Sequence, residues 1–74
     1  MKINISEINK TVVVNLRRII TEKNIKKKII ANQIGVSATE FSAMLNGRKL
    51  ITVEHICKLL DALQVEANEL FRRN

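Results

Sequence analysis

Apolar residues recur at intervals of three or four along most of the 74-residue chain, and no segment alternates between apolar and polar positions as a strand does. This spacing matches the period of an α-helix with one buried face. The pattern predicts five short helices, over about 6–23, 30–35, 37–47, 52–63 and 66–71. We therefore expect an all-α fold, a compact bundle of five short helices in a single domain spanning 1–74, with residues 1–5 flexible or extended.

Two glycines and one serine mark the ends of the second and third helices. Gly35 and Gly47 each follow a helical pattern, at the place where a left-handed residue commonly ends a helix. Ser37 stands three residues before Glu40, which is the spacing of a capping box. In that motif the Ser37 hydroxyl accepts a hydrogen bond from the Glu40 amide, and the Glu40 carboxylate accepts one from the Ser37 amide. The tight connection between Gly35 and Ser37 is typical of a helix-turn-helix, which we place at about 26–46.

The composition excludes several classes of function. One cysteine cannot form a disulfide within the chain, and the apolar runs are too short to span a membrane. The first residues lack the apolar segment of a signal peptide, so we expect a cytoplasmic protein with no membrane partner. His55 and Cys57, the only histidine and cysteine, point to different faces of a helix, and Cys57 is expected to be partly buried. The sequence thus predicts no metal, no cofactor, no small-molecule ligand and no enzymatic activity.

The net charge of +6 lies in the middle of the chain. Between Arg17 and Lys49 stand eight lysines and arginines against two glutamates, whereas cations and anions balance in the remainder. Such a concentration indicates a surface that faces phosphates, because each neutralised phosphate releases bound counterions. A solvated lysine face, an anionic membrane and an acidic protein partner are the alternatives that the charge leaves open.

The stretch IANQIGVSATEFSAMLNG, from Ile30 to Gly47, resembles the helix-turn-helix of the phage-repressor and Cro type, also called the XRE family. The matching positions are Ala31, Gly35, Val36, Ser37, Phe41, Ser42, Met44, Asn46 and Gly47. The segment LLDALQVEANELF, from Leu59 to Phe71, resembles the closing pattern of the same family. The resemblance implies a lambda-repressor-like domain whose third helix enters the major groove of double-stranded DNA. It also implies a homodimer, so that two such helices meet successive grooves about 34 Å apart.

The resemblance and the charge pattern together indicate which residues contact DNA. The predicted DNA-binding residues are Lys27, Lys28, Ser37, Ala38, Thr39, Ser42, Ala43, Asn46, Arg48 and Lys49. Lys27 matches a phosphate-contact position of the family, and Asn46, Arg48 and Lys49 are read as phosphate contacts beyond the third helix. Ala38, Thr39 and Ala43 match positions where longer polar residues often touch bases, and none of them can form the paired hydrogen bonds worth about 1–3 kcal/mol each. We therefore expect weak direct readout, with DNA shape carrying part of the specificity.

Three departures from the family pattern carry predictions of their own. Ile20 and Leu45 stand where the family often has a buried Arg–Glu ion pair, and we expect these two side chains to touch. Lys26 replaces the usual Ser or Thr cap of the second helix, so that the cap should be missing. Gln64 replaces a frequent glycine after the fourth helix and should adopt a left-handed conformation.

These observations favour a sequence-specific, double-stranded-DNA-binding transcriptional regulator, a repressor that acts as a homodimer. The alternative is an antitoxin or antirepressor-type module whose main partner is another protein, with DNA binding secondary. Leu70, Phe71, Ile3 and Ile5 are candidate dimer contacts, and closure of the core is the competing role for the first two. Ile, Lys and Asn make up 27 of the 74 residues, a bias that indicates an AT-rich bacterial or phage genome.

Overall fold

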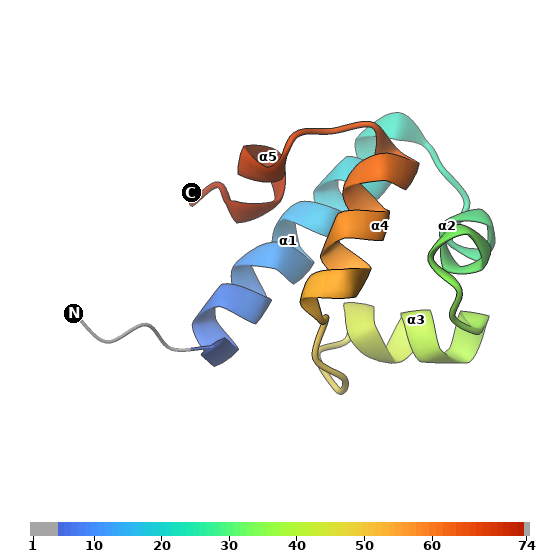
Figure 1. The fold of residues 1–74 in the computed structure, drawn as a ribbon, viewed down its shortest axis with the longest axis horizontal. Helices are drawn as coiled ribbons and strands as arrows, with labels where there is room; N and C mark the ends of the chain where they lie inside the picture. Colours follow the sequence, from blue (N-terminus) through green and yellow to red (C-terminus); the bar gives the residue numbers. More distant parts are fainter. Residues whose placement is uncertain (1–4, 74) are drawn as a thin grey trace.

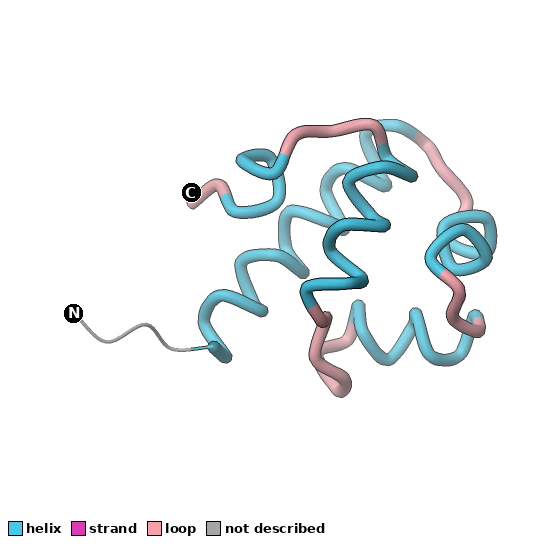
Figure 2. The backbone as a smooth tube through the Cα atoms, viewed as in Figure 1, coloured by secondary structure: helices cyan, strands magenta, loops and turns pink. Residues whose placement is uncertain are grey.

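The computed structural model describes residues 5–73 and shows them as an all-α bundle (Figure 1). The helices are α1 (Ile5–Lys23), α2 (Lys27–Ile34), α3 (Ala38–Leu45), α4 (Val53–Leu63) and α5 (Ala67–Phe71). The predicted fold class and the order of five helices are thus confirmed over the described residues, with short loops between the helices (Figure 2). Helix α1 begins at Ile5, inside the stretch expected to be flexible or extended, and residues 1–4 lie outside the described part.

Helix α1 runs along the length of the molecule in Figure 1, with α4 crossing it in that view, while α2 and α3 lie at one end. The helix pairs with the most extensive contacts are α1 with α5, α2 with α4, α2 with α3, and α1 with α3. Helix α5 covers α1 at a place distant from α3 (Figure 1). Helix α3 therefore rests on α1 and α2 and keeps its remaining face open.

One hydrophobic core joins all five helices. Its fully buried side chains include Leu16 of α1, Ile30 of α2, Phe41 of α3, Leu59 of α4 and Leu70 of α5. These residues belong to the apolar positions that the sequence spaces three or four apart, and such positions share one face of a helix. The periodicity of the sequence therefore identified the buried faces.

The departures from the family pattern have structural counterparts. Ile20 and Leu45 are both buried in the same core cluster, in line with an apolar pair at that place. Lys26 precedes α2 in an extended conformation and its side chain makes no capping bond, as predicted. Gln64 ends α4 with a φ of 55°, which confirms the left-handed conformation. That conformation costs a non-glycine residue about 1–2 kcal/mol.

The glycines that flank α3 also have the predicted conformation. Gly35 and Gly47 have φ values of 79° and 77°. A Cβ added at Gly35 would meet only the Lys58 Nζ at 4.0 Å, so the backbone conformation rather than crowding favours glycine there. The turn between α2 and α3 is therefore encoded locally.

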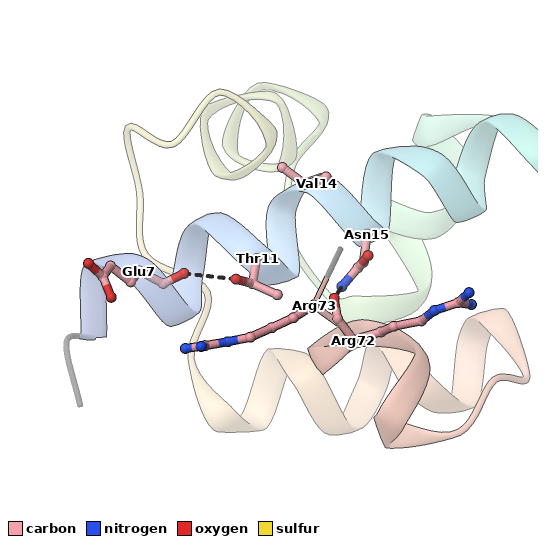
Figure 3. A pocket seen from close by; sticks show the side chains of 6 residues that line it. All are labelled: Glu7, Thr11, Val14, Asn15, Arg72 and Arg73. Carbon is pink, nitrogen blue, oxygen red and sulfur yellow. Dashed lines mark hydrogen bonds between the residues drawn. The ribbon is translucent and has the colours of Figure 1, made fainter. Parts of the chain in front are cut away.

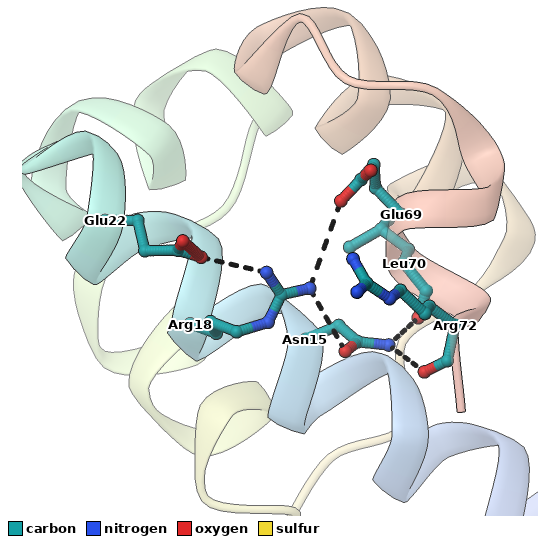
Figure 4. A network of polar contacts seen from close by, with 6 residues as sticks. All are labelled: Asn15, Arg18, Glu22, Glu69, Leu70 and Arg72. Atoms are coloured by element: carbon teal, nitrogen blue, oxygen red, sulfur yellow. Dashed lines mark hydrogen bonds and ion pairs between the residues drawn. The ribbon is translucent and has the colours of Figure 1, made fainter. Parts of the chain in front are cut away.

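A polar network attaches α5 to α1 (Figure 4). Asn15 is fully buried, and its Nδ2 donates hydrogen bonds to the carbonyl oxygens of Leu70 at 2.7 Å and Arg72 at 2.8 Å. Arg18 lies beside it, with Nη1 2.8 Å from Glu22 and Nη2 4.0 Å from Glu69. A buried amide whose donors are both satisfied specifies how the two helices meet.

The candidate dimer contacts have different surroundings. Leu70 is fully buried and closes the core, whereas Phe71 is 42% exposed and remains open to a partner. Ile3 and the side chain of Ile5 lie outside the described part of the structure.

Cys57 is exposed, so the prediction that it is partly buried is wrong. The buried stripe of α4 runs through Leu59 and Leu63, and position 57 lies off that stripe. Within residues 5–73, no group of three or more His, Cys, Asp or Glu side chains is arranged to hold a metal ion. No helix of the described part is long and apolar enough to cross a membrane.

Candidate nucleic-acid interface

The exposed face of α3 carries the predicted base-facing residues. Ala38, Thr39 and Ser42 are exposed and Ala43 is half-buried, whereas Phe41, Met44 and Leu45 on the opposite face are buried. A single shallow depression brings together six of the predicted DNA-binding residues: Ala38, Thr39, Ser42, Ala43, Asn46 and Arg48. The face is lined by short side chains, so that the backbone of α3 can approach a ligand closely.

The start of α3 is fixed by a side-chain cap. Ser37 is extended, and its Oγ accepts a hydrogen bond from the Glu40 amide at 3.0 Å. This half of the predicted capping box is confirmed. The principal hydrogen bond of the Glu40 carboxylate, however, comes from the Lys49 ammonium, and the Ser37 amide contributes less to lowering the pKa of that carboxyl. The predicted capping role of the Glu40 side chain is therefore secondary, because an oppositely charged group nine residues away is the stronger partner.

The pairing with Lys49 changes the acidity of Glu40. The Lys49 hydrogen bond, which outweighs desolvation, lowers the pKa of the Glu40 carboxyl below its ordinary value of 4.5. Glu40 is therefore ionised at neutral pH, and Lys49 neutralises a negative charge that would otherwise stand beside the α3 face. Of the three predicted phosphate contacts after α3, Asn46 and Arg48 are exposed and Lys49 is engaged with Glu40.

Three lysines lie at the start of α2. Lys26, Lys27 and Lys28 are all exposed. Lys28 shares a depression with Ala38 of α3, so the beginnings of the two helices border one surface. The amides in the first turn of α2 receive no side-chain cap from Lys26, and first-turn amides lack partners within a helix. The positive helix end and the lysines together favour an anion at this place.

The connection after α3 is tied to α1 by two side chains that the sequence gave no reason to single out. Arg17 Nη1 donates a hydrogen bond to the Leu45 carbonyl oxygen at 2.9 Å. Asn9 Oδ1 accepts one from the Ile51 amide at 3.1 Å. Both bonds join residues far apart in the sequence, so no local motif indicates them.

A second cap follows this connection at the start of α4. Thr52 accepts a hydrogen bond from the His55 amide at 3.2 Å, and His55 Nδ1 accepts one from the Thr52 amide at 3.5 Å. His55 thus serves as the third-position partner of a capping box, and a Thr with a polar residue three positions later was the available sequence signal.

Another depression lies between α1 and the C-terminal residues (Figure 3). Its lining residues are Glu7, Thr11, Val14, Asn15, Arg72 and Arg73. In Figure 3 the Arg73 side chain extends toward the Glu7 end of this depression and Arg72 points the other way, and the Thr11 hydroxyl donates a hydrogen bond to the Glu7 carbonyl oxygen at 3.1 Å. This mixed surface shares no residue with the depression on α3, and it offers a cation, Arg73, that can serve as a control for charge.

Comparison with known proteins agrees with this geometry. The family model of the Cro/C1-type helix-turn-helix DNA-binding domain matches residues 15–74. The chain belongs to this family, whose domains bind double-stranded DNA to regulate transcription and are typically not enzymes. No curated protein and no solved structure gives a significant match.

Proposed function

We propose that the protein is a transcriptional repressor that binds specific sites on double-stranded DNA as a homodimer, with α3 in the major groove. The observation that carries the proposal is the exposed face of α3, made of short side chains and bordered by cations on both sides. Lys28 shares a depression with Ala38 at the start of α3, Arg48 shares one with Ala43 and Asn46 at its end, and Lys27 is an exposed neighbour of Lys28. A neutral face between cations suits a groove between two phosphate backbones.

The length and position of each side chain decide whether it contacts phosphates or bases. Lys27, Lys28, Asn46 and Arg48 bind phosphates and set the position of α3. The Thr39 and Ser42 hydroxyls and the methyl groups of Ala38 and Ala43 lie closest to the bases, where they accept or donate single hydrogen bonds or contact thymine methyls. Because single contacts discriminate weakly, the bendability and groove width of the DNA contribute to the choice of site.

The length of α3 supports the proposed homodimer. A helix of eight residues reaches only a few base pairs, so a second copy one helical turn away supplies the rest of a site. Phe71 is a candidate dimer contact because it stays 42% exposed beside the buried Leu70. Sedimentation equilibrium of the free protein and of its DNA complex measures this stoichiometry directly.

The salt dependence of DNA binding tests the proposed surface. We expect Lys27→Ala and Arg48→Ala each to reduce the slope of log K against log salt by about 0.9, the value for one lost phosphate contact. Arg73→Ala is the matched control, since it removes one positive charge from the depression in Figure 3 and should leave the slope unchanged. Equal slopes for the native protein and these three variants would show that α2 and α3 do not form the DNA-binding surface.

The short side chains of α3 also suit the alternative role, an antitoxin or antirepressor-type module whose main partner is a protein. The exposed lysines at the start of α2 oppose it. Weak DNA binding that is insensitive to salt, together with unchanged slopes in the variants, would favour this second function.

A further inference from the structure

Two side chains of α1 hold the connection between α3 and α4 at its two ends. Arg17 Nη1 donates to the carbonyl oxygen of Leu45, the last residue of α3, at 2.9 Å. Asn9 Oδ1 accepts from the amide of Ile51, near the start of α4, at 3.1 Å. The segment between these bonds contains Arg48, the exposed cation next to the α3 face.

The two anchors lie on one side of α1. Asn9, Val13 and Arg17 are spaced four residues apart, so their side chains follow one another along the same helix face. All three line a single depression together with residues of the connection, among them Gly47 and Leu50. The α1 face is therefore shaped around the connection over two helical turns.

Burial does little to hold this connection in place. Residues 46–50 are all exposed, so no packed side chain determines where the segment lies. The last carbonyl groups of a helix have no partner within the helix, and a cation near them is also favoured by the helix dipole. Arg17 supplies both the hydrogen bond and the positive charge at the end of α3.

We propose that Asn9 and Arg17 are positioning residues for DNA binding, which hold the end of α3 and Arg48 in the arrangement that meets phosphates. The proposal rests on the proposed function. The Arg17 guanidinium bonds the Leu45 carbonyl group, so Arg17 acts on DNA binding through α3. Asn9 acts at the other end through the Ile51 amide. Without both bonds, the segment around Arg48 would be held only by its own backbone bonds to α3 and by the Lys49–Glu40 pair. Part of its order would then have to be regained on binding, and DNA affinity would fall by that amount.

Amide hydrogen exchange of the free protein tests the positioning without DNA. The probes are the amides of Gly47 and Arg48, which donate to Met44 and Ala43 carbonyls, and the Val65 amide after α4 is the internal reference. We expect Arg17→Ala and Asn9→Ala to raise exchange about fivefold at Gly47 and Arg48, with Val65 unchanged.

Two further variants separate the bond from the charge. Arg18→Ala removes the same charge one position along α1, where the side chain faces Glu22 and Glu69, and should leave Gly47 and Arg48 unchanged. Arg17→Lys retains a donor and a charge and should restore most of the protection. Equal acceleration at Gly47, Arg48 and Val65 in Arg17→Ala would indicate a general loss of stability and overturn the proposal.

A double-mutant cycle tests the consequence for binding. The probe is a duplex of the DNA upstream of the protein's own gene, compared with a random-sequence duplex. We expect Arg17→Ala to weaken binding about fivefold in the native protein but less than about twofold when Arg48 is already alanine. A full fivefold loss in the Arg48→Ala background would make Arg17 an independent phosphate contact, and the proposal would be wrong. If the native protein binds neither duplex, the proposed function fails, while the exchange measurement still decides whether Asn9 and Arg17 order the connection.

Discussion

Helices α2 and α3 are both eight residues long, yet they begin in opposite ways. Helix α3 begins with Ser37, whose hydroxyl accepts a hydrogen bond from the Glu40 amide. Helix α2 begins with Lys26, whose side chain caps nothing, and two more lysines follow. Both preceding residues have extended backbone, with φ of −73° at Ser37 and −75° at Lys26, so the geometry for a cap exists at both places.

The contrast shows how stability and binding are divided between neighbouring helices. A serine cap contributes about 0.5–2 kcal/mol, which α2 lacks. Cations at the positive end of a helix add an electrostatic cost of a few tenths of a kcal/mol each. Under the proposed function both costs are offset on DNA, because a phosphate bonds the free amides and pairs with the lysines. At the start of α3 no phosphate is needed for this purpose, because the Ser37 hydroxyl already accepts a hydrogen bond from the Glu40 amide.

Giving α2 the cap that it lacks should produce the largest change. We expect Lys26→Asp to weaken binding to duplex DNA about tenfold, because the charge is reversed where a phosphate would lie. The same change should raise the free energy of unfolding by about 1 kcal/mol, since the carboxylate accepts from the first-turn amides of α2. DNA titrations at fixed salt and urea unfolding measure the two effects.

Lys26→Ala is the matched control for that variant. It removes the charge without adding a cap, so it should weaken DNA binding by less than Lys26→Asp and leave stability nearly unchanged. A stability gain as large in Lys26→Ala as in Lys26→Asp would mean that lysine repulsion, and not the missing cap, distinguishes the two helix starts.

Removing the cap that α3 possesses should have the next largest effect. We expect Ser37→Ala to lower the free energy of unfolding by about 1 kcal/mol, which for a domain of this size lowers Tm by about 4–8 °C. Ser42→Ala, on the exposed middle of the same helix, should leave Tm unchanged or slightly higher, because alanine is the better helix former. Thermal unfolding followed by circular dichroism measures both, and a loss of equal size at Ser42 would contradict a role for capping.

Separating Lys49 from Glu40 should have the smallest effect. It should raise DNA affinity, whereas Lys26→Asp lowers it. In Glu40→Gln the Lys49 ammonium becomes available to a phosphate and a negative charge near the groove disappears. We expect DNA affinity to rise about threefold, with a steeper salt slope. An affinity that stays the same or falls would indicate that Lys49 serves only to hold α3 in place.

The same pair predicts a pH dependence of stability. The pKa of the Glu40 carboxyl is lowered in the folded protein, so its contribution to stability is complete above its ordinary value of 4.5 and is lost as pH falls through the lowered value. Native protein should therefore lose slightly more stability than Glu40→Gln between neutral pH and strongly acidic pH, as urea midpoints at both ends of that range would show.

Much of the candidate interface could be predicted because its determinants are local. Gly35 and Gly47 have the left-handed conformation that their positions indicated, and Ser37 caps α3 as its spacing to Glu40 suggested. The missing cap was predicted because Lys26 stands where the family usually has Ser or Thr. A cap or a turn depends on residues within four positions of one another, so a short stretch of sequence contains all the groups involved.

The failures have a common cause. The main partner of the Glu40 carboxylate is Lys49, which lies outside the motif that suggested the role of Glu40. Cys57 was expected to be partly buried because of its residue type, but burial is decided by which face of α4 meets the core, and that face carries Leu59 and Leu63. Arg17 was one of the cations of the predicted phosphate-facing surface, and nothing in the sequence indicated that its guanidinium would bond the Leu45 carbonyl group.

The sequence by itself determined the helices, the turn between α2 and α3, the buried faces and the neutral, short-chained surface of α3 between cations. Periodicity, capping and backbone preference act over a few residues, and they do not depend on where distant parts of the chain lie. Only the tertiary structure decided the bonds between distant parts of the chain: Arg17 to Leu45 and Asn9 to Ile51 beside that surface, and Asn15 to Leu70 between α1 and α5. Each of these bonds joins groups that meet only after the core has brought α1 against α3, the following connection and α5. Their formation depends on the packing of the whole bundle, which no local pattern expresses.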